Sequence, residues 1–202
     1  MTHYLDPQFL ISTLGLLGIF AIVFAESGLF FGFFLPGDSL LFTAGLFASQ
    51  GHLNIFWLII GIAIAAILGD SVGYSFGRKV GPALFSREDS FFFHKKHAER
   101  ARAFYEKHGV KTIILARFIP IIRTFAPIIA GIGGMHYRTF ISYNIIGGIF
   151  WTLLLTLSGY LLGTVIPGIE KYLNLIIVFI IFISLVPIFV EYIKEKRKKA
   201  TL

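Results

Sequence analysis

The chain alternates long apolar stretches with short polar ones. Residues 9–49 contain Glu26 and Asp38 as their only charged residues, and residues 53–77 contain only Asp70. Residues 140–163 and 173–190 contain no charged residue. One membrane crossing needs roughly 20 apolar residues, and residues 9–49 are about twice that length. The pattern therefore predicts an all-α polytopic membrane protein, in which residues 9–49 hold more than one element.

Two apolar regions carry both helix breaks and charges, which a plain membrane helix does not. Residues 29–48 contain Asp38, and residues 112–135 contain Arg117 and Arg123. Irregular backbone at membrane depth is tolerated only where protein or water satisfies it. We therefore predict a re-entrant hairpin in each region. The predicted hairpin breaks are Pro36, Gly37, Pro120 and Pro127.

The charge distribution orients the chain and excludes a soluble protein. Only 14% of residues are charged, against roughly 25% in soluble domains, and the formal net charge is +7. Basic residues concentrate in residues 78–111 and 191–202, a distribution typical of the cytoplasmic ends of membrane helices. Both clusters are cytoplasmic only if residues 112–135 enter the membrane and return. The C-terminus is therefore predicted to be cytoplasmic, and the N-terminus as well.

Two halves of the chain share a spaced pattern that indicates a repeat. The motifs of the first half recur 86 residues later. Ala44-Gly45, Ile59-Ile60-Gly61, Gly73-Tyr74 and Gly77 correspond to Ala130-Gly131, Ile145-Ile146-Gly147, Gly159-Tyr160 and Gly163. The helix of the first unit runs toward the cytoplasm and that of the second away from it. Inverted repeats with broken helices are typical of transporters.

The predicted architecture is a single membrane domain over residues 1–202, made of inverted repeats with flanking helices. Its elements are a transmembrane helix 9–25, re-entrant hairpin 29–48, transmembrane helix 53–77, cytoplasmic amphipathic segment 86–111, re-entrant hairpin 112–135, transmembrane helices 139–164 and 172–191, and a basic cytoplasmic tail 192–202.

The candidate site consists of four charged residues in apolar surroundings, namely Glu26, Asp38, Arg117 and Arg123. An ionised side chain at the bilayer centre costs roughly 2.5 to 3.5 kcal/mol or more unless it is paired or hydrated. Crossing the two hairpins would bring the acids to the arginines. One interpretation is a structural salt-bridge cluster that holds the hairpins together. The alternative is a functional polar site.

The residue types of that cluster favour the binding of an anion together with proton exchange. Arginine offers a planar fork of donors that matches a phosphate. Arg117 and Arg123 are therefore predicted to bind a phosphate headgroup. A buried carboxylate changes its protonation as its surroundings change, so Glu26 and Asp38 are predicted to couple protons to transport.

Asp70 and Asn144 are candidate supporting residues for this site. Asp70 lies either in the polar site or near the cytoplasmic interface, and its depth decides between the two. For Asn144 and Trp151, helix packing is the simpler interpretation.

The remaining motifs indicate neither an enzyme nor a metal protein. Residues 86–111 have the pattern of an amphipathic helix on the anionic cytoplasmic leaflet. His94 and His97 lie three residues apart without a partnering acid cluster, so no metal site is predicted. No Walker loop, nucleophile elbow or zinc-protease motif is present, and no cofactor is expected. The basic clusters are membrane-flanking, so nucleic acid is not an expected partner. The sequence leaves a homo-oligomer open.

Several of these residues together resemble the DedA family, whose shared region is also called the VTT or SNARE-associated domain. The resemblance covers roughly residues 20–165. It is carried by Glu26, by Phe34-Leu35-Pro36-Gly37-Asp38, by Gly69-Asp70 with Gly73-Tyr74, and by Ala116-Arg117-Phe118-Ile119-Pro120 with Arg123-Thr124. The match extends to Tyr105-Glu106-Lys107-His108-Gly109, Asn144, Gly147 and Trp151.

The resemblance implies a bacterial inner-membrane protein with two opposed re-entrant hairpins. It also implies movement of undecaprenyl phosphate or a phospholipid across the membrane, often in dependence on the proton-motive force. By motif position, Glu26 and Asp38 match the membrane acids of the family, and Arg117 and Arg123 its essential arginines. The expected function is thus a flippase-like or scramblase-like lipid transporter. The alternatives are a proton-coupled carrier of a small solute or cation and a non-transporting membrane scaffold.

Overall fold

A computed structural model describes residues 7–29, 35–86, 112–166 and 168–172, together with 175, 176, 178 and 179. All regular structure within these residues is helical, which confirms the all-α class. The elements are α1 (Pro7–Gly28), α2 (Gly37–Ser49), α3 (Ile55–Ser86), α5 (Thr112–Ala116), α6 (Pro120–Ile132), α7 (Tyr137–Val165) and a short 3-10 helix η3 (Ile169–Tyr172). The predicted amphipathic segment 86–111, the helix 172–191 and the tail 192–202 lie almost entirely outside the described residues.

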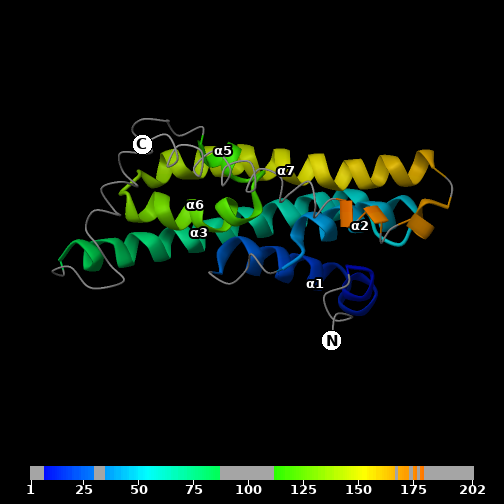
Figure 1. The fold of residues 1–202 in the computed structure, drawn as a ribbon, viewed down its shortest axis with the longest axis horizontal. Helices are drawn as coiled ribbons and strands as arrows, with labels where there is room; N and C mark the ends of the chain where they lie inside the picture. Colours follow the sequence, from blue (N-terminus) through cyan, green and yellow to red (C-terminus); the bar gives the residue numbers. More distant parts are fainter. Residues whose placement is uncertain are drawn as a thin grey trace, which may run out of the picture.

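Two long apolar helices, α3 and α7, run antiparallel along the molecule (Figure 1). Residues 55–81 and 137–165 within them are long and apolar enough to cross a membrane. Asn144 of α7 donates to the carbonyl of Ile67, while Phe140 stacks on Tyr74 with ring centroids 4.6 Å apart. The residue numbers of these contacts increase along α3 while they decrease along α7, so the two helices are antiparallel.

Helix α3 continues nine residues beyond the end expected from the sequence at residue 77. Its last turns pack closely on α6 through glycines. A Cβ at Gly77 would lie 2.1 Å from the carbonyl oxygen of Ile128, and a Cβ at Gly131 would lie 2.2 Å from that of Tyr74. Gly77, the last residue of the predicted transmembrane helix, therefore lies inside α3, where it allows the close approach of α6.

Helix α2 packs on α7 in a similar way. A Cβ at Gly45 would lie 2.0 Å from the carbonyl oxygen of Thr156, and a Cβ at Gly159 would lie 2.0 Å from that of Phe42. Small residues let helix backbones approach this closely, and this packing is common in membrane helices. Four of the glycines that predicted a repeat, Gly45, Gly77, Gly131 and Gly159, are therefore positions at which two helix backbones touch.

Helices α2 and α6 begin beside one another and extend in opposite directions (Figure 1). From its start, α6 follows α3 toward Ser86. Helix α2 follows α7 toward Val165 instead. The helix starts thus meet near the middle of the molecule, where the charged residues of both are brought together.

Helix α1 lies against α3 and has a kink at Gly15, whose φ is 60°. Near its C-terminal end, a Cβ at Gly28 would lie 2.8 Å from the carbonyl oxygen of Gly69. The apolar core between α1, α2 and α3 is fully buried. It includes Ile19, Val23, Leu40, Leu41, Leu58 and Ile62.

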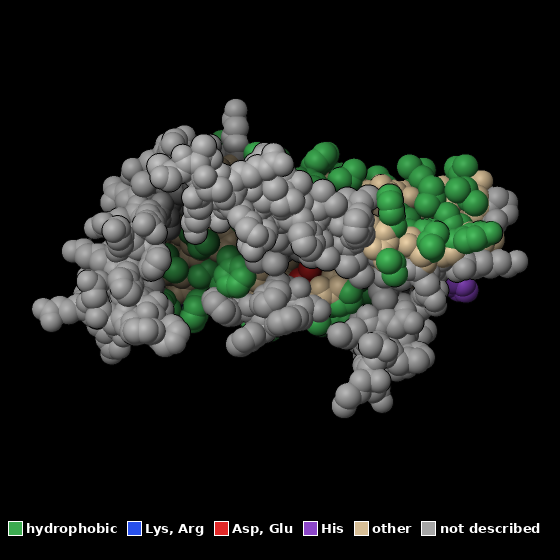
Figure 2. All heavy atoms as spheres, viewed as in Figure 1, with side chains coloured by type: hydrophobic (Ala, Val, Ile, Leu, Met, Phe, Trp, Pro, Cys, Tyr) green, Lys and Arg blue, Asp and Glu red, His purple; other side chains and the backbone are tan. Residues whose placement is uncertain are grey.

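The outer faces of the long helices carry large exposed apolar side chains. Phe56, Trp57, Leu68 and Phe76 on α3 are each more than half exposed. Figure 2 shows apolar side chains over much of the described surface on the right, where α7 ends, and an acidic side chain near the middle of this face. Charged side chains in the interior and apolar side chains on the outer surface suit a protein that is surrounded by lipid.

Candidate functional site

A break between α5 and α6 places the two arginines. Helix α5 ends at Ala116, and Arg117 lies in the turn that follows. Ile119 is extended, with φ −120° and ψ 107°, because a residue before proline is disfavoured in the helical region. Pro120 then begins α6, a position where its missing N–H costs nothing. Arg117 therefore lies in the break and Arg123 in the first turn of α6.

Arg123 is held by two carboxylates from other helices. Its Nη1 donates to Oδ1 of Asp38 at 2.5 Å, and its Nη2 donates to Oε1 of Glu26. Glu26 comes from the last turn of α1 and Asp38 from the first turn of α2. The side chains of Arg123 and Glu26 are almost completely buried, and Asp38 is 17% exposed. Three helices thus meet at one guanidinium.

Trp151 of α7 completes this first cluster. Its indole N–H donates to Oδ1 of Asp38 at 3.0 Å, and its ring centroid lies 4.6 Å from Cζ of Arg123. A tryptophan face attracts a cation, so the ring and the N–H support both members of the ion pair. The simpler interpretation of Trp151 as a packing residue was incomplete. Its polar edge faces the site.

The Glu26 carboxylate fits into this cluster because residue 37 is a glycine. A Cβ at Gly37 would lie 1.6 Å from Oε2 of Glu26, so no other residue leaves space for the carboxylate. The carboxylate also lies at the N-terminal end of α2, where the helix dipole favours a negative charge. Gly37, predicted as a hairpin break, therefore has a second role in placing an acid.

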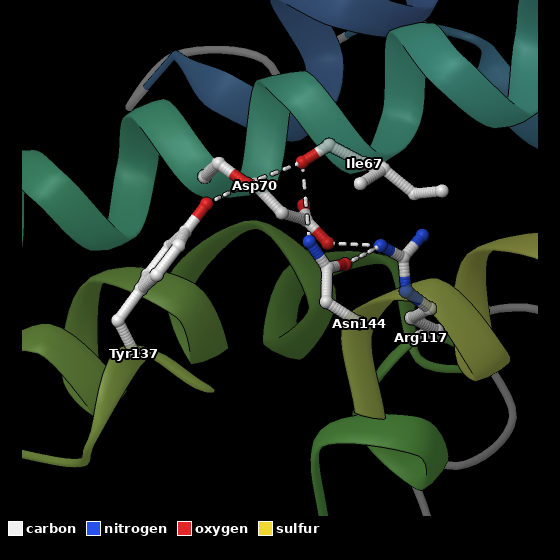
Figure 3. Close-up of polar contacts among 6 residues, drawn as sticks. Ile67, Asp70, Arg117, Tyr137 and Asn144 are labelled. Carbon is white, nitrogen blue, oxygen red and sulfur yellow. Dashed lines mark hydrogen bonds and ion pairs between the residues drawn. The ribbon is translucent and has the colours of Figure 1, made fainter. Parts of the chain in front are cut away.

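Arg117 forms a second cluster with two residues of the long helices (Figure 3). Its Nη2 donates both to Oδ2 of Asp70 on α3 and to Oδ1 of Asn144 on α7. The Asn144 amide in turn donates to the carbonyl of Ile67 at 3.1 Å. In Figure 3, Arg117, Asp70 and Asn144 point toward one another from separate segments.

The guanidinium of Arg117 is only partly used. Its Nε and Nη1, which carry three N–H groups, have no hydrogen-bond partner among the described residues, and Arg117 is 2% exposed. Arg123 differs in degree, because only its Nε lacks a partner among the described residues, while both of its terminal nitrogens have a carboxylate partner. The two arginines are therefore not equivalent.

A pair of glycines on α7 makes space for Arg117. A Cβ at Gly147 would lie 2.9 Å from Cδ of Arg117, and a Cβ at Gly148 would lie 3.5 Å from its Cζ. Any larger side chain at Gly147 would meet the arginine stem. Both glycines are buried, so they form one wall of the Arg117 site.

The charges of the two clusters do not balance. Two arginines face three carboxylates, those of Glu26, Asp38 and Asp70, in the part of the chain that the structure describes. Full ionisation would leave one uncompensated negative charge, which is costly in a buried site. The described residues hold no group of three His, Asp or Glu arranged for a metal ion.

The structure brings together all four charged residues singled out from the sequence, but it distributes them differently. Both predicted acids contact Arg123, and Arg117 pairs with Asp70. Asp70 therefore lies in the polar site, and Asn144 hydrogen-bonds within it. Asn144 is one of the two candidate supporting residues named from the sequence, as a polar side chain in an uncharged stretch of the chain.

Comparisons with known proteins agree with the pattern of these residues. The VTT domain family matches residues 35–161, a range that includes Asp38, Asp70, Arg117, Arg123 and Asn144. Protein DedA of Escherichia coli (strain K12) is 50% identical over 90% of this chain and 84% of that protein. The chain belongs to the DedA family.

Other relatives in the family are named as membrane proteins. An uncharacterized membrane protein of Mycobacterium leprae (strain TN) is 47% identical over 91% of this chain and 84% of its own length. Inner membrane protein YqjA of Escherichia coli (strain K12) is 36% identical over 76% of this chain and 70% of its own length. No solved structure matches the chain. Family membership thus supports an inner-membrane protein with a transport-related role.

Proposed function

We propose that this protein moves a lipid with a phosphate headgroup across the inner membrane, and that the movement is coupled to protons. The lipids implied by the resemblance are undecaprenyl phosphate and phospholipids. The observation that carries the proposal is the buried guanidinium of Arg117, of which two nitrogens have no hydrogen-bond partner among the described residues.

The donor pattern of Arg117 favours binding over a purely structural role. Leaving buried donors unpaired costs free energy, so a residue that only holds helices together is expected to have its donors satisfied. Arg123 meets that expectation at both terminal nitrogens, but Arg117 does not. A phosphate has acceptor oxygens that match the N–H groups left open on Arg117.

The excess of carboxylates supports proton coupling. A proton on Glu26 or Asp38 would neutralise the uncompensated charge of the empty site. An entering phosphate brings negative charge and competes with these acids for Arg123. A carboxylate that loses Arg123 to the phosphate takes up a proton, and it releases that proton when the lipid leaves. Arg123 thus joins Arg117 in binding the headgroup during this exchange.

Helices α2 and α6 run in opposite directions from the central charged site, which supports a mechanism in which the site opens to one side of the membrane at a time. We propose that α2 with α3, and α6 with α7, belong to inverted repeats whose hairpins enter the membrane from opposite sides. Each hairpin helix packs on the long helix of the other repeat through paired glycines, Gly45 with α7 and Gly131 with α3. Movement of one hairpin would expose the charged site to one side while the lipid tail stays in the bilayer.

The test is leaflet exchange by the purified protein in liposomes. Undecaprenyl phosphate and a common phospholipid are compared, each with and without a pH gradient. We expect exchange of one phosphate lipid that accelerates with the gradient. No exchange of either lipid by folded protein would contradict the proposal and favour a small-solute carrier or a scaffold.

A further inference from the structure

Three threonines on the two helices that meet at Asp38 and Trp151 are buried. Thr43 of α2 and Thr152 and Thr156 of α7 are each 0% exposed. The hydroxyl of each has no hydrogen-bond partner among the described residues. Burying a hydroxyl without a partner costs free energy, so each of the three needs an explanation. The proposed lipid site does not use them.

Other hydroxyls on the same helices show that these three differ. Helical Ser and Thr commonly bond to a carbonyl three or four residues earlier. Five hydroxyls in α3 and α7 do so at 2.5 to 2.9 Å, those of Ser71, Ser75, Ser142, Ser158 and Thr164. Because Thr152 and Thr156 lack this bond on the same α7, their hydroxyls remain available to another group.

The threonines follow the interface of α2 and α7 away from Asp38. Contact between Asp38 and Trp151 marks one end of this interface. Further along, Gly45 meets the backbone of Thr156. Thr152 follows Trp151 directly, Thr156 lies one helical turn later, and Thr43 precedes Gly45 by two residues. The hydroxyls therefore lie between Asp38 and the end of α2 at Ser49.

We propose that Thr43, Thr152 and Thr156 form a water-binding niche that conducts protons between Asp38 and the membrane side at Ser49. The inference rests on the proton coupling proposed above. Hydroxyls donate and accept at once, and a buried water makes about three hydrogen bonds to such groups.

The transfer itself conserves charge and protons. A hydronium ion at the aqueous end gives up one proton, which passes through water and hydroxyl groups to the carboxylate of Asp38. Asp38 becomes a neutral acid, and the reverse transfer restores its charge. Among the described residues, the charged groups that face it are Arg123 of α6 and Glu26 of α1. Helix α3, which also contacts α2, contributes Asp70 in its pair with Arg117.

Water access is tested by cysteine labelling, because the chain has no cysteine of its own. Thr156→Cys is compared with Leu154→Cys, a residue of α7 that is 45% exposed on the apolar outer surface. A thiol in water ionises and reacts, so a small methanethiosulfonate reagent added at the Ser49 side should label Thr156→Cys at least about tenfold faster. Equal or slower labelling would overturn the niche. Labelling needs no lipid transport, so this result is independent of the proposed function.

The role in proton transfer is tested by removing one hydroxyl. Thr156→Val keeps the shape of the side chain, and Thr156→Ser keeps the hydroxyl. We expect Thr156→Val to lose most of the acceleration of lipid exchange by a pH gradient, while exchange without a gradient is unchanged and Thr156→Ser behaves as the wild type. If Thr156→Val keeps the full acceleration of lipid exchange by the pH gradient and differs only in a higher unfolding temperature, the proposal is overturned.

Discussion

Asp38 and Arg123, 85 residues apart in the chain, form an ion pair of 2.5 Å at the start of two oppositely directed helices. The pair joins α2 to α6 at the point where they diverge. Any movement of one helix relative to the other must break this contact or carry both residues along. Under the proposed proton coupling, this ion pair links the protonation of a carboxylate to the relative position of α2 and α6.

Glu26→Gln should separate proton coupling from lipid binding. The change removes one of the three buried negative charges and keeps the shape of the side chain. We expect lipid exchange to lose its dependence on the pH gradient while lipid binding is retained. Exchange rates measured in liposomes over a range of pH values check this, with Asp38→Asn for comparison. Unchanged pH dependence would exclude Glu26 as the proton site.

Gly147→Ala should disable the Arg117 site without a change of charge. A Cβ at this position would lie 2.9 Å from Cδ of Arg117, so the guanidinium must move. We expect exchange to fall about 100-fold, because small misplacements of a binding group are costly.

Gly73→Ala is the matched control for Gly147→Ala. It lies in the other long helix, and its nearest neighbour would be 3.5 Å from the new Cβ. Alanine is favoured over glycine within helices by roughly 1 kcal/mol, so this variant should be at least as stable as the wild type and should transport normally. Equal activity of the two variants would show that the position of Arg117 does not matter.

Trp151→Phe should weaken the first cluster while it keeps an aromatic face over Arg123. The variant loses the N–H that donates to Asp38 at 3.0 Å. Hydrogen bonds to charged groups contribute about 1.5 to 3 kcal/mol, so unfolding in detergent should occur at a lower temperature. Trp151→Leu also loses the contact with Arg123 and should unfold at a lower temperature still. If both variants are as stable as the wild type, Trp151 is a packing residue only.

Gly45→Ala and Gly131→Ala should behave alike if the repeats are inverted copies. A new Cβ would lie 2.0 Å and 2.2 Å from backbone carbonyl oxygens of α7 and α3. Overpacking of this kind typically costs about 1 to 3 kcal/mol. Thermal unfolding of both variants measures the effect. A loss confined to one of them would argue that the two helix pairs are not equivalent.

The long apolar stretches were sufficient to predict the helical class, and the prolines at Pro36 and Pro120 marked two of the breaks. The predicted break at Pro127 was wrong, because Pro127 lies inside the continuous helix α6. Pro36 and Pro120 restrict the backbone locally, so α2 and α6 begin where the sequence indicates. The gathering of Glu26, Asp38, Arg117 and Arg123 was also predictable, because four charges in apolar segments need partners.

The pairing within the clusters could not be predicted from the sequence. Which acid faces which arginine depends on how the helices pack together, and one of the contacts that fix α1 against α3 is the close approach of Gly28 to Gly69. That contact is a tertiary one, and no local pattern specifies it. Asp70 therefore remained ambiguous until the helices were placed, and the division of the site into two unequal arginines was not foreseen.

Substitution of Arg117 by lysine tests the central claim most directly. Lysine keeps the positive charge beside Asp70 but lacks the planar set of N–H donors. Leaflet exchange in liposomes is measured for the wild type, Arg117→Lys and Arg117→Ala, after each protein is shown to be folded. We predict that Arg117→Lys is nearly as inactive as Arg117→Ala. Full activity of Arg117→Lys would show that the site needs only a charge, and it would contradict recognition of phosphate by the open N–H groups of Arg117.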